Sequence, residues 1–155
     1  MPEAYTHIRI ARVARTQSGV GAANAAYEMG ANGPDPLFAY RILSKRRPYP
    51  LPQLGSRMHV EQCGRFLRVM IFSAVTPAQR SYVLGFLAHY AGDSVLHPYI
   101  AFQTGEGGQF HTPHGHGFCE VAMDTMFYEQ DCGKRAVPAS VAAPTLAPQE
   151  LAEIV

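Results

Sequence analysis

The sequence predicts an all-α fold. No segment shows the apolar and polar alternation with a period of two that is typical of a half-buried strand. Apolar runs with helical spacing are instead separated by Gly and Pro clusters, which end one helix and precede the next. With 155 residues, 47% of them hydrophobic, the chain is long enough for one domain with a sizeable core.

Two helices are expected near the amino end, over residues 6–15 and 19–30. In the first, Ile8, Ala11 and Ala14 lie roughly on one side, which would face the core. The second is rich in alanine, a good helix former, and ends at a glycine.

Proline, glycine and serine mark the next boundaries. Gly33-Pro34 breaks the chain in a turn, and Pro36 suits the first turn of a short helix. A Pro-rich loop follows. Ser56 is then expected to cap one long helix through residues 57–75.

The next helix has a clear start, because Thr76 offers a hydroxyl N-cap and Pro77 follows it. We expect it to end at His97, since Pro98 disfavours a helical conformation in the residue before it. About 21 residues would make it ~30 Å long, enough to cross the domain. After a Gly-rich loop, a further helix is expected over residues 116–131.

We assign residues 1–132 to one helical domain. After Gly133 the composition shifts to an Ala/Pro-rich segment, which is typical of a linker, and the final ELAEIV begins a possible further helix. Residues 133–155 are therefore expected to be a linker and the start of that helix.

Charge and cysteine content limit the class of protein. The formal net charge is +1, so we expect no stable nucleic-acid partner. The dense basic run Lys45-Arg46-Arg47 is expected to be a solvated loop, with a phosphate-attracting rim as the alternative. The three cysteines follow no CxxC pattern, which favours a reducing compartment. With neither a signal-peptide pattern nor a transmembrane segment in the sequence, a soluble, cytoplasmic protein is expected.

One apolar helix carries a polar stripe. His89, Asp93 and His97 are spaced four residues apart, so they share one ~80° sector of the helix surface. His89 and His97 lie ~12 Å apart along the axis, too far to share one ion at ligand distances of about 2 Å. Neighbouring residues of the stripe, which are four positions apart, can bind the same ion. The stripe therefore indicates two metal ions.

A second helix has the same spacing. His116 and Glu120 are four residues apart, and Asp124 extends their face by another turn. Pairing this face with His97 would give one ion two His and one Glu ligand. Asp124 is expected to orient His116 rather than bind metal, and His111 or His114 are alternatives to His116.

Three further residues are candidate ligands. His59 is the natural third ligand beside His89 and Asp93, and His7 with Asp35 and the second Asp93 oxygen could hold a third ion. The alternative is a purely structural hydrogen-bond network. Leaving such groups buried and unpaired would cost several kcal/mol, which favours metal binding.

These residues occur in motifs of one known family. THIRIA, GANGPDPLFAY, LGSRMHVEQ, GFLAHYAGDSVLHP and HGFCE follow one another over residues 5–130. In this order they resemble the zinc-dependent phospholipase C family and, more distantly, the single-strand-specific zinc nucleases. The resemblance implies a multi-helix domain of the phospholipase C and zinc nuclease-like type.

The resemblance also implies a cleft with zinc ions. On this resemblance, one ion would be bound by His59, His89 and Asp93, and a second by His97, His116 and Glu120. A third would be bound by His7 and Asp93. Asp35 would lie close to the ions that activate water. Secreted family members complete the third site with an amino-terminal Trp, and this sequence contains no Trp. We therefore expect two to three zinc ions.

The expected activity is that of a zinc-dependent phosphodiesterase acting on a phospholipid headgroup. Zinc ions held by imidazoles and carboxylates suit a phosphodiester, and Asp35 is predicted to orient or deprotonate the attacking water. The alternatives are a single-strand nuclease or 3′-nucleotidase with the same ions, and a zinc-binding module without turnover.

Overall fold

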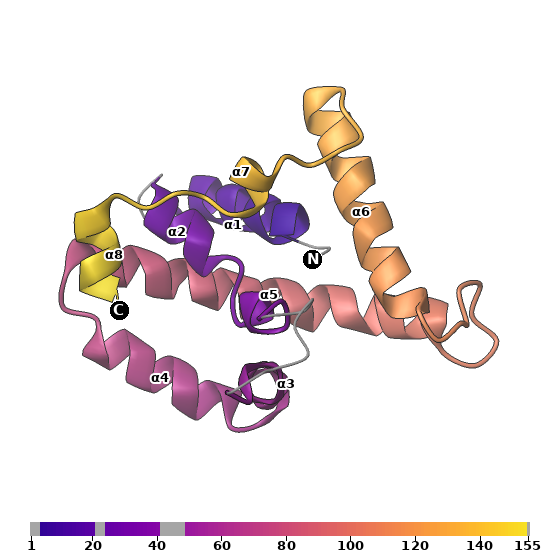
Figure 1. Ribbon diagram of the computed structural model, residues 1–155, viewed down its shortest axis with the longest axis horizontal. Helices are drawn as coiled ribbons and strands as arrows, with labels where there is room; N and C mark the ends of the chain where they lie inside the picture. The colour runs from indigo at the N-terminus through magenta and orange to yellow at the C-terminus, as the bar shows by residue number, and fades with distance from the viewer. Residues whose placement is uncertain (1–3, 21–23, 41–48, 155) are drawn as a thin grey trace.

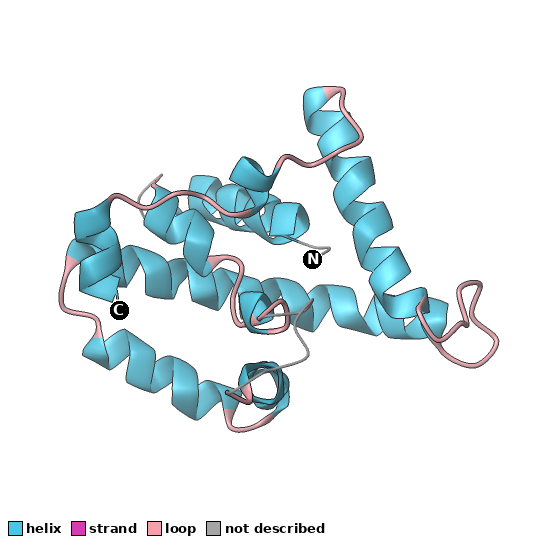
Figure 2. Cartoon of the chain, viewed as in Figure 1, coloured by secondary structure: helices cyan, strands magenta, loops and turns pink. Residues whose placement is uncertain are grey.

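The computed structural model describes residues 4–20, 24–40 and 49–154, and the regular elements in this part of the chain are all helical (Figures 1 and 2). The prediction of an all-α fold is confirmed. The basic run at residues 45–47 lies outside the described residues, as does part of the predicted second helix. None of the described helices is both long and apolar enough to span a bilayer.

The central element is α5 (Pro77–Thr104), which crosses the whole molecule in Figure 1. Its predicted start is confirmed: the Thr76 hydroxyl accepts from the Gln79 backbone N–H, and the Gln79 side chain accepts from the Thr76 N–H. Its predicted end at His97 is wrong, because the helix continues through Pro98. A proline removes one backbone hydrogen bond, and we attribute the continuation to Ile100, which is only 1% exposed.

Helices α1 (Ala4–Ser18) and α2 (Ala25–Gly30) pack against α5. The core between them contains Ile8, Ala11, Tyr27, Ala31 and Ala88. Helix α2 can approach α5 closely because glycines face the partner backbone on both sides. A Cβ at Gly30 would overlap the Tyr82 carbonyl oxygen, and one at Gly85 would overlap that of Tyr27.

The single helix predicted over residues 57–75 is wrong. The chain forms α3 (Leu51–Val60) and α4 (Cys63–Ser73), separated at Gln62, whose φ of 51° is left-handed. Nor does Ser56 cap a helix: it lies inside α3, which starts earlier because Pro50 and Pro52 favour a first turn, and its hydroxyl donates to the Pro52 carbonyl.

The remaining elements place the candidate site. After α2, the one-turn helix η1 (Asp35–Leu37) forms at the predicted turn. Helix α6 (Gly115–Cys132) rises from the far end of α5. Beyond Gly133, α7 (Ala139–Ala142) contacts α1 and α8 (Pro148–Ile154) contacts α5.

Candidate metal centre

The eight predicted metal ligands come from five elements and gather beside the middle of α5. They form three groups, and within each group one ligand atom per residue lies within 4.8 Å of the others. The groups are His7, His89 and Asp93; Asp35, His59 and His89; and His97, His116 and Glu120. The third group contains the two His and one Glu that the helix spacing predicts for one ion.

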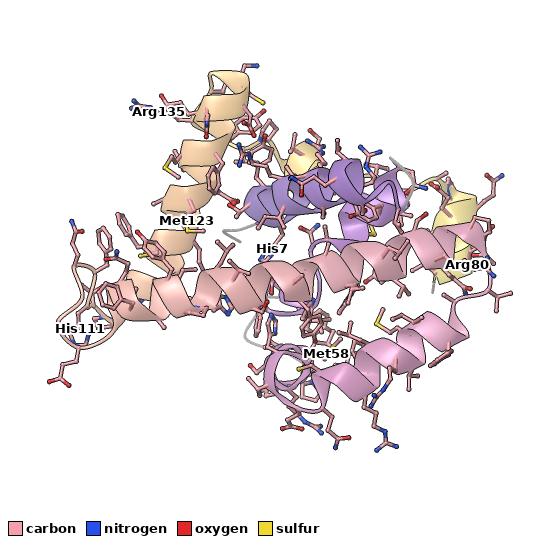
Figure 3. All side chains as sticks on the ribbon, turned by 180° about the vertical axis from the view of Figure 1, so that it is seen from behind. His7, Met58, Arg80, His111, Met123 and Arg135 are labelled. Carbon is pink, nitrogen blue, oxygen red and sulfur yellow. The ribbon has the colours of Figure 1, made fainter. Side chains whose placement is uncertain are left out.

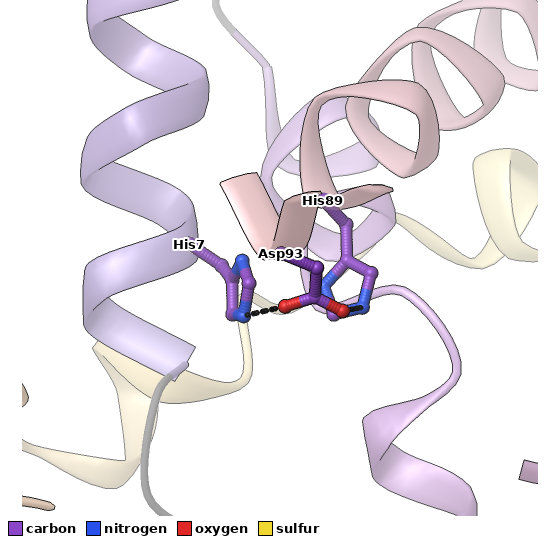
Figure 4. A group of neighbouring side chains, drawn as sticks. All are labelled: His7, His89 and Asp93. Atoms are coloured by element: carbon purple, nitrogen blue, oxygen red, sulfur yellow. Dashed lines mark ion pairs between the residues drawn. The ribbon is translucent and has the colours of Figure 1, made fainter. Parts of the chain in front are cut away.

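Asp93 is the shared residue of the centre. Its Oδ1 lies 3.3 Å from His7 Nε2 and 3.5 Å from His97 Nε2. Its Oδ2 lies 3.2 Å from His89 Nε2 and 3.7 Å from His59 Nε2. Figure 4 shows the carboxylate between the His7 and His89 rings. One carboxylate thus faces four imidazoles that belong to all three groups.

His89 has the orientation of a metal ligand. It is fully buried, and its Nδ1 lies 3.2 Å from the Ala31 carbonyl oxygen, to which it can donate. Its Nε2 has no hydrogen-bond partner among the described residues, although the Asp93 carboxylate is close. A lone pair facing a carboxylate is the arrangement that a cation between them would stabilise. The left-handed turn at Gly33 (φ +53°) packs on this ring, where a Cβ would overlap it.

His59 is held in the same manner from α3. Its Nδ1 lies 2.8 Å from the Gly55 carbonyl oxygen, and its Nε2 lies 3.0 Å from Asp35 Oδ1. The Tyr90 hydroxyl donates to the Met58 carbonyl and so ties the end of α3 to α5 beside this ring. This role of Tyr90 could not be predicted from the sequence, because a lone aromatic residue on an apolar helix carries no signal of its partner.

The third group joins the two longest helices and is the most exposed. His116 Nε2 lies 2.5 Å from Glu120 Oε1, and His97 Nε2 lies 4.0 Å from the same oxygen. Glu120 is buried, whereas the side chains of His97 and His116 are 39% and 54% exposed. The alternatives His111 and His114 are in none of the groups formed by the described residues.

The electrostatics fit a bound cation. Burial raises the pKa of Asp93, but the neighbouring His89, His7 and His97 outweigh it and hold that pKa below the usual range. Burial lowers the pKa of His59, whereas its hydrogen bonds to Asp35 and the Gly55 carbonyl raise it above the ordinary value. The donor set, imidazole nitrogens with carboxylate oxygens, is one that zinc prefers. Protons would compete with the metal at acidic pH.

Asp124 links α6 to the first turn of α1. Its Oδ1 accepts from the Thr6 N–H at 2.8 Å and from the Thr6 hydroxyl at 2.6 Å, and its Oδ2 accepts from the Tyr5 N–H at 3.2 Å. Free N–H groups at a helix start favour a carboxylate. Asp124 therefore positions the helix that carries His7, while its predicted contact with His116 stays a prediction.

Asp124→Asn should lower the free energy of unfolding by about 2 kcal/mol, because hydrogen bonds from buried groups to a charged acceptor are worth more than neutral ones. Urea unfolding of the zinc-loaded protein measures this. The control is Glu129→Gln on the same helix, which breaks only an exposed ion pair with Arg135 and should change stability by less than about 1 kcal/mol. Equal losses in the two variants would contradict the assigned role.

Comparison with known proteins gives one result. The family model described as zinc dependent phospholipase C matches residues 6–149, which include all eight candidate ligands. No curated protein and no solved structure gives a significant match.

Proposed function

The chain belongs to the zinc-dependent phospholipase C family, and on this premise we propose that it hydrolyses the headgroup phosphodiester of a phospholipid. The products would be diacylglycerol and a phosphorylated headgroup. The observation that supports this proposal best is the contact of one carboxylate, Asp93, with four imidazoles, which suits a cluster of ions rather than a single one.

We propose that two or three zinc ions bind to the three groups. His97, His116 and Glu120 would hold one ion, and His59, His89 and Asp93 another. His7 with the other Asp93 oxygen would contribute to the third. Bound zinc supplies Lewis-acid polarisation of the phosphoryl group and lowers the pKa of water towards neutrality.

Asp35 is the proposed catalytic carboxylate. It stands on the one-turn helix η1, its Oδ1 is 3.0 Å from His59 Nε2, and its side chain is 21% exposed, so solvent can reach it. A carboxylate in this position can orient the attacking water and accept its proton. The buried Asp93 and Glu120 are better placed to hold positive charge, since they have little access to substrate.

Zinc removal tests the proposal. The purified chain is expected to contain two to three zinc ions by elemental analysis and to release a water-soluble phosphorylated headgroup from phosphatidylcholine. Dialysis against a chelator should abolish this activity, and zinc should restore it, because the protein groups alone do not supply the Lewis acid.

Other substrates are measured in parallel. Cleavage of single-stranded DNA or of a 3′-nucleotide with no headgroup release would replace the phospholipase proposal by a nuclease or nucleotidase. Full zinc content without turnover on any of these substrates would indicate a zinc-binding module.

A further inference from the structure

Helix α4 is an apolar helix that the fold leaves largely uncovered. None of its eleven residues, all of them described, is buried. Phe72, Val69 and Ile71 are 84%, 57% and 46% exposed, and Val75 just beyond the helix is also exposed. Exposed apolar residues are ordinary when single, but neighbouring ones mark an interaction surface.

The inner side of α4 accounts for its attachment to the molecule. The Phe66 ring packs on Phe86 of α5 with ring centroids 5.7 Å apart, and Met70 and Tyr82 line the same small, largely apolar pocket of about 170 Å³. Phe72 lies about 120° around the helix from Phe66, and Val69 lies between them, three residues from each, at the border of the exposed side. Figure 3 shows α4 at the edge of the molecule.

The exposed side also carries positive charge. Arg65 and Arg68 precede Val69 and Phe72 by four residues, so the cations and the apolar groups share one face. From residue 62 to residue 92 the sequence contains three Arg and no Asp or Glu. The ion pairs of arginine within the described residues involve Arg9, Arg12, Arg57 and Arg135. Arg65 and Arg68 are both exposed, and the long hydrogen bond of Arg65 to Gln62 Oε1 (3.4 Å) leaves most of its guanidinium donors for an external anion.

The face is connected directly to the candidate centre. Helix α3 carries His59 in its last turn and ends at Val60, which is exposed, and α4 begins three residues later. A surface that binds α4 would therefore lie next to the element that supplies a candidate zinc ligand.

We propose that the exposed face of α4, formed by Arg65, Arg68, Val69, Ile71 and Phe72, docks on the surface of an anionic phospholipid bilayer. Apolar side chains would enter the acyl boundary, and the two guanidinium groups would pair with lipid phosphates. This inference deepens the proposed function, since the bilayer is the source of the proposed substrate. The combination of apolar and exclusively basic residues favours a lipid surface over a protein partner.

Vesicle binding tests the proposal without using turnover. The zinc-loaded full chain is sedimented with vesicles of phosphatidylcholine mixed with phosphatidylglycerol. We expect Phe72→Ser to lower the partition coefficient by about tenfold, the loss expected when an aromatic side chain no longer leaves water. Arg65→Gln with Arg68→Gln should remove the preference for anionic vesicles, and added salt should weaken wild-type binding.

The matched control is Phe102→Ser on α5, because Phe102 is 76% exposed but lies far from α4 along the chain. It should leave vesicle binding unchanged. Zinc content and helicity are compared in all variants to show that the fold is retained. Equal losses for the Phe72 and Phe102 variants would overturn the proposal, as would wild-type protein that does not bind vesicles. It would also be overturned if Phe72→Ser instead dissociated a dimer.

A second readout separates this proposal from the proposed function. Hydrolysis of a short-chain phospholipid dissolved as monomers should be the same in wild type and Phe72→Ser, whereas hydrolysis of vesicles should fall with binding. Loss of activity on both forms would place Phe72 in the fold or the catalytic centre, and would overturn its role in docking. Binding without hydrolysis of either form would refute the phospholipase proposal alone.

Discussion

Asp93→Asn is expected to remove at least one zinc ion per chain and to lower the rate of phospholipid hydrolysis by at least about 10³-fold, the equivalent of some 4 kcal/mol of transition-state stabilisation. The reason is geometric. Together, the two Asp93 oxygens face imidazoles from all three groups, at O···N distances of 3.2–3.7 Å. An amide is uncharged, and its NH₂ group would hydrogen-bond to an imidazole rather than repel it. The fold should therefore persist while metal affinity falls.

Two comparisons make this prediction specific. Ser94→Ala, on the exposed side of the same helix, should leave zinc content and activity unchanged. His116→Ala should affect the third group alone and cost one ion. Zinc content is measured after gel filtration. If the Asp93→Asn protein kept the wild-type number of zinc ions, the inference that this carboxylate is shared by the candidate ion sites would be refuted.

Gly85→Ala is expected to produce the largest loss of stability, about 3 kcal/mol or more in the free energy of unfolding. A Cβ there would overlap the Tyr27 carbonyl oxygen, which is backbone and cannot rotate away. Helix α2 would have to move off α5, carrying with it Ala31, whose carbonyl oxygen lies 3.2 Å from His89 Nδ1. Loss of zinc affinity should accompany the loss of stability.

Gly64→Ala in α4 is the matched control, because nothing lies within 4 Å of a Cβ at that position. It should raise the free energy of unfolding by about 0.5 kcal/mol, since alanine favours a helix more than glycine does. Urea unfolding of the zinc-loaded variants measures both changes. Equal effects at the two positions would show that close contact between α2 and α5 is not what requires Gly85.

The parts of the centre that depend on local spacing could be predicted from the sequence. His89, Asp93 and His97 share a face because helix geometry places them there, and His116 with Glu120 follows the same rule. The side chains that meet from distant elements were grouped only by elimination and by family resemblance. The contact of Asp124 with Thr6, 118 residues away, could not be predicted, because no local pattern encodes a tertiary hydrogen bond.

The two helix boundaries that were predicted wrongly also have physical causes. Gln62 adopts a left-handed conformation, which glycine or asparagine adopts more often. Because glutamine gives no such signal, the sequence around residue 62 does not indicate the break between α3 and α4. Pro98 indicated that α5 would end at His97, but the helix continues, and we attribute this to the burial of Ile100. Local propensity is a weak guide where tertiary packing acts on the same residues.

The position of the candidate ligands along the chain has a consequence for biosynthesis. The centre combines His7, near the amino end, with Glu120 on α6, and Asp124 ties these two helices together. A nascent polypeptide still lacking α6 would have neither His116 and Glu120 of the third group nor the Asp124 anchor for its first helix. Stable metallation should therefore follow translation of α6, and a ribosome-stalled fragment ending at the Gly-rich loop should lose zinc far faster than the released protein.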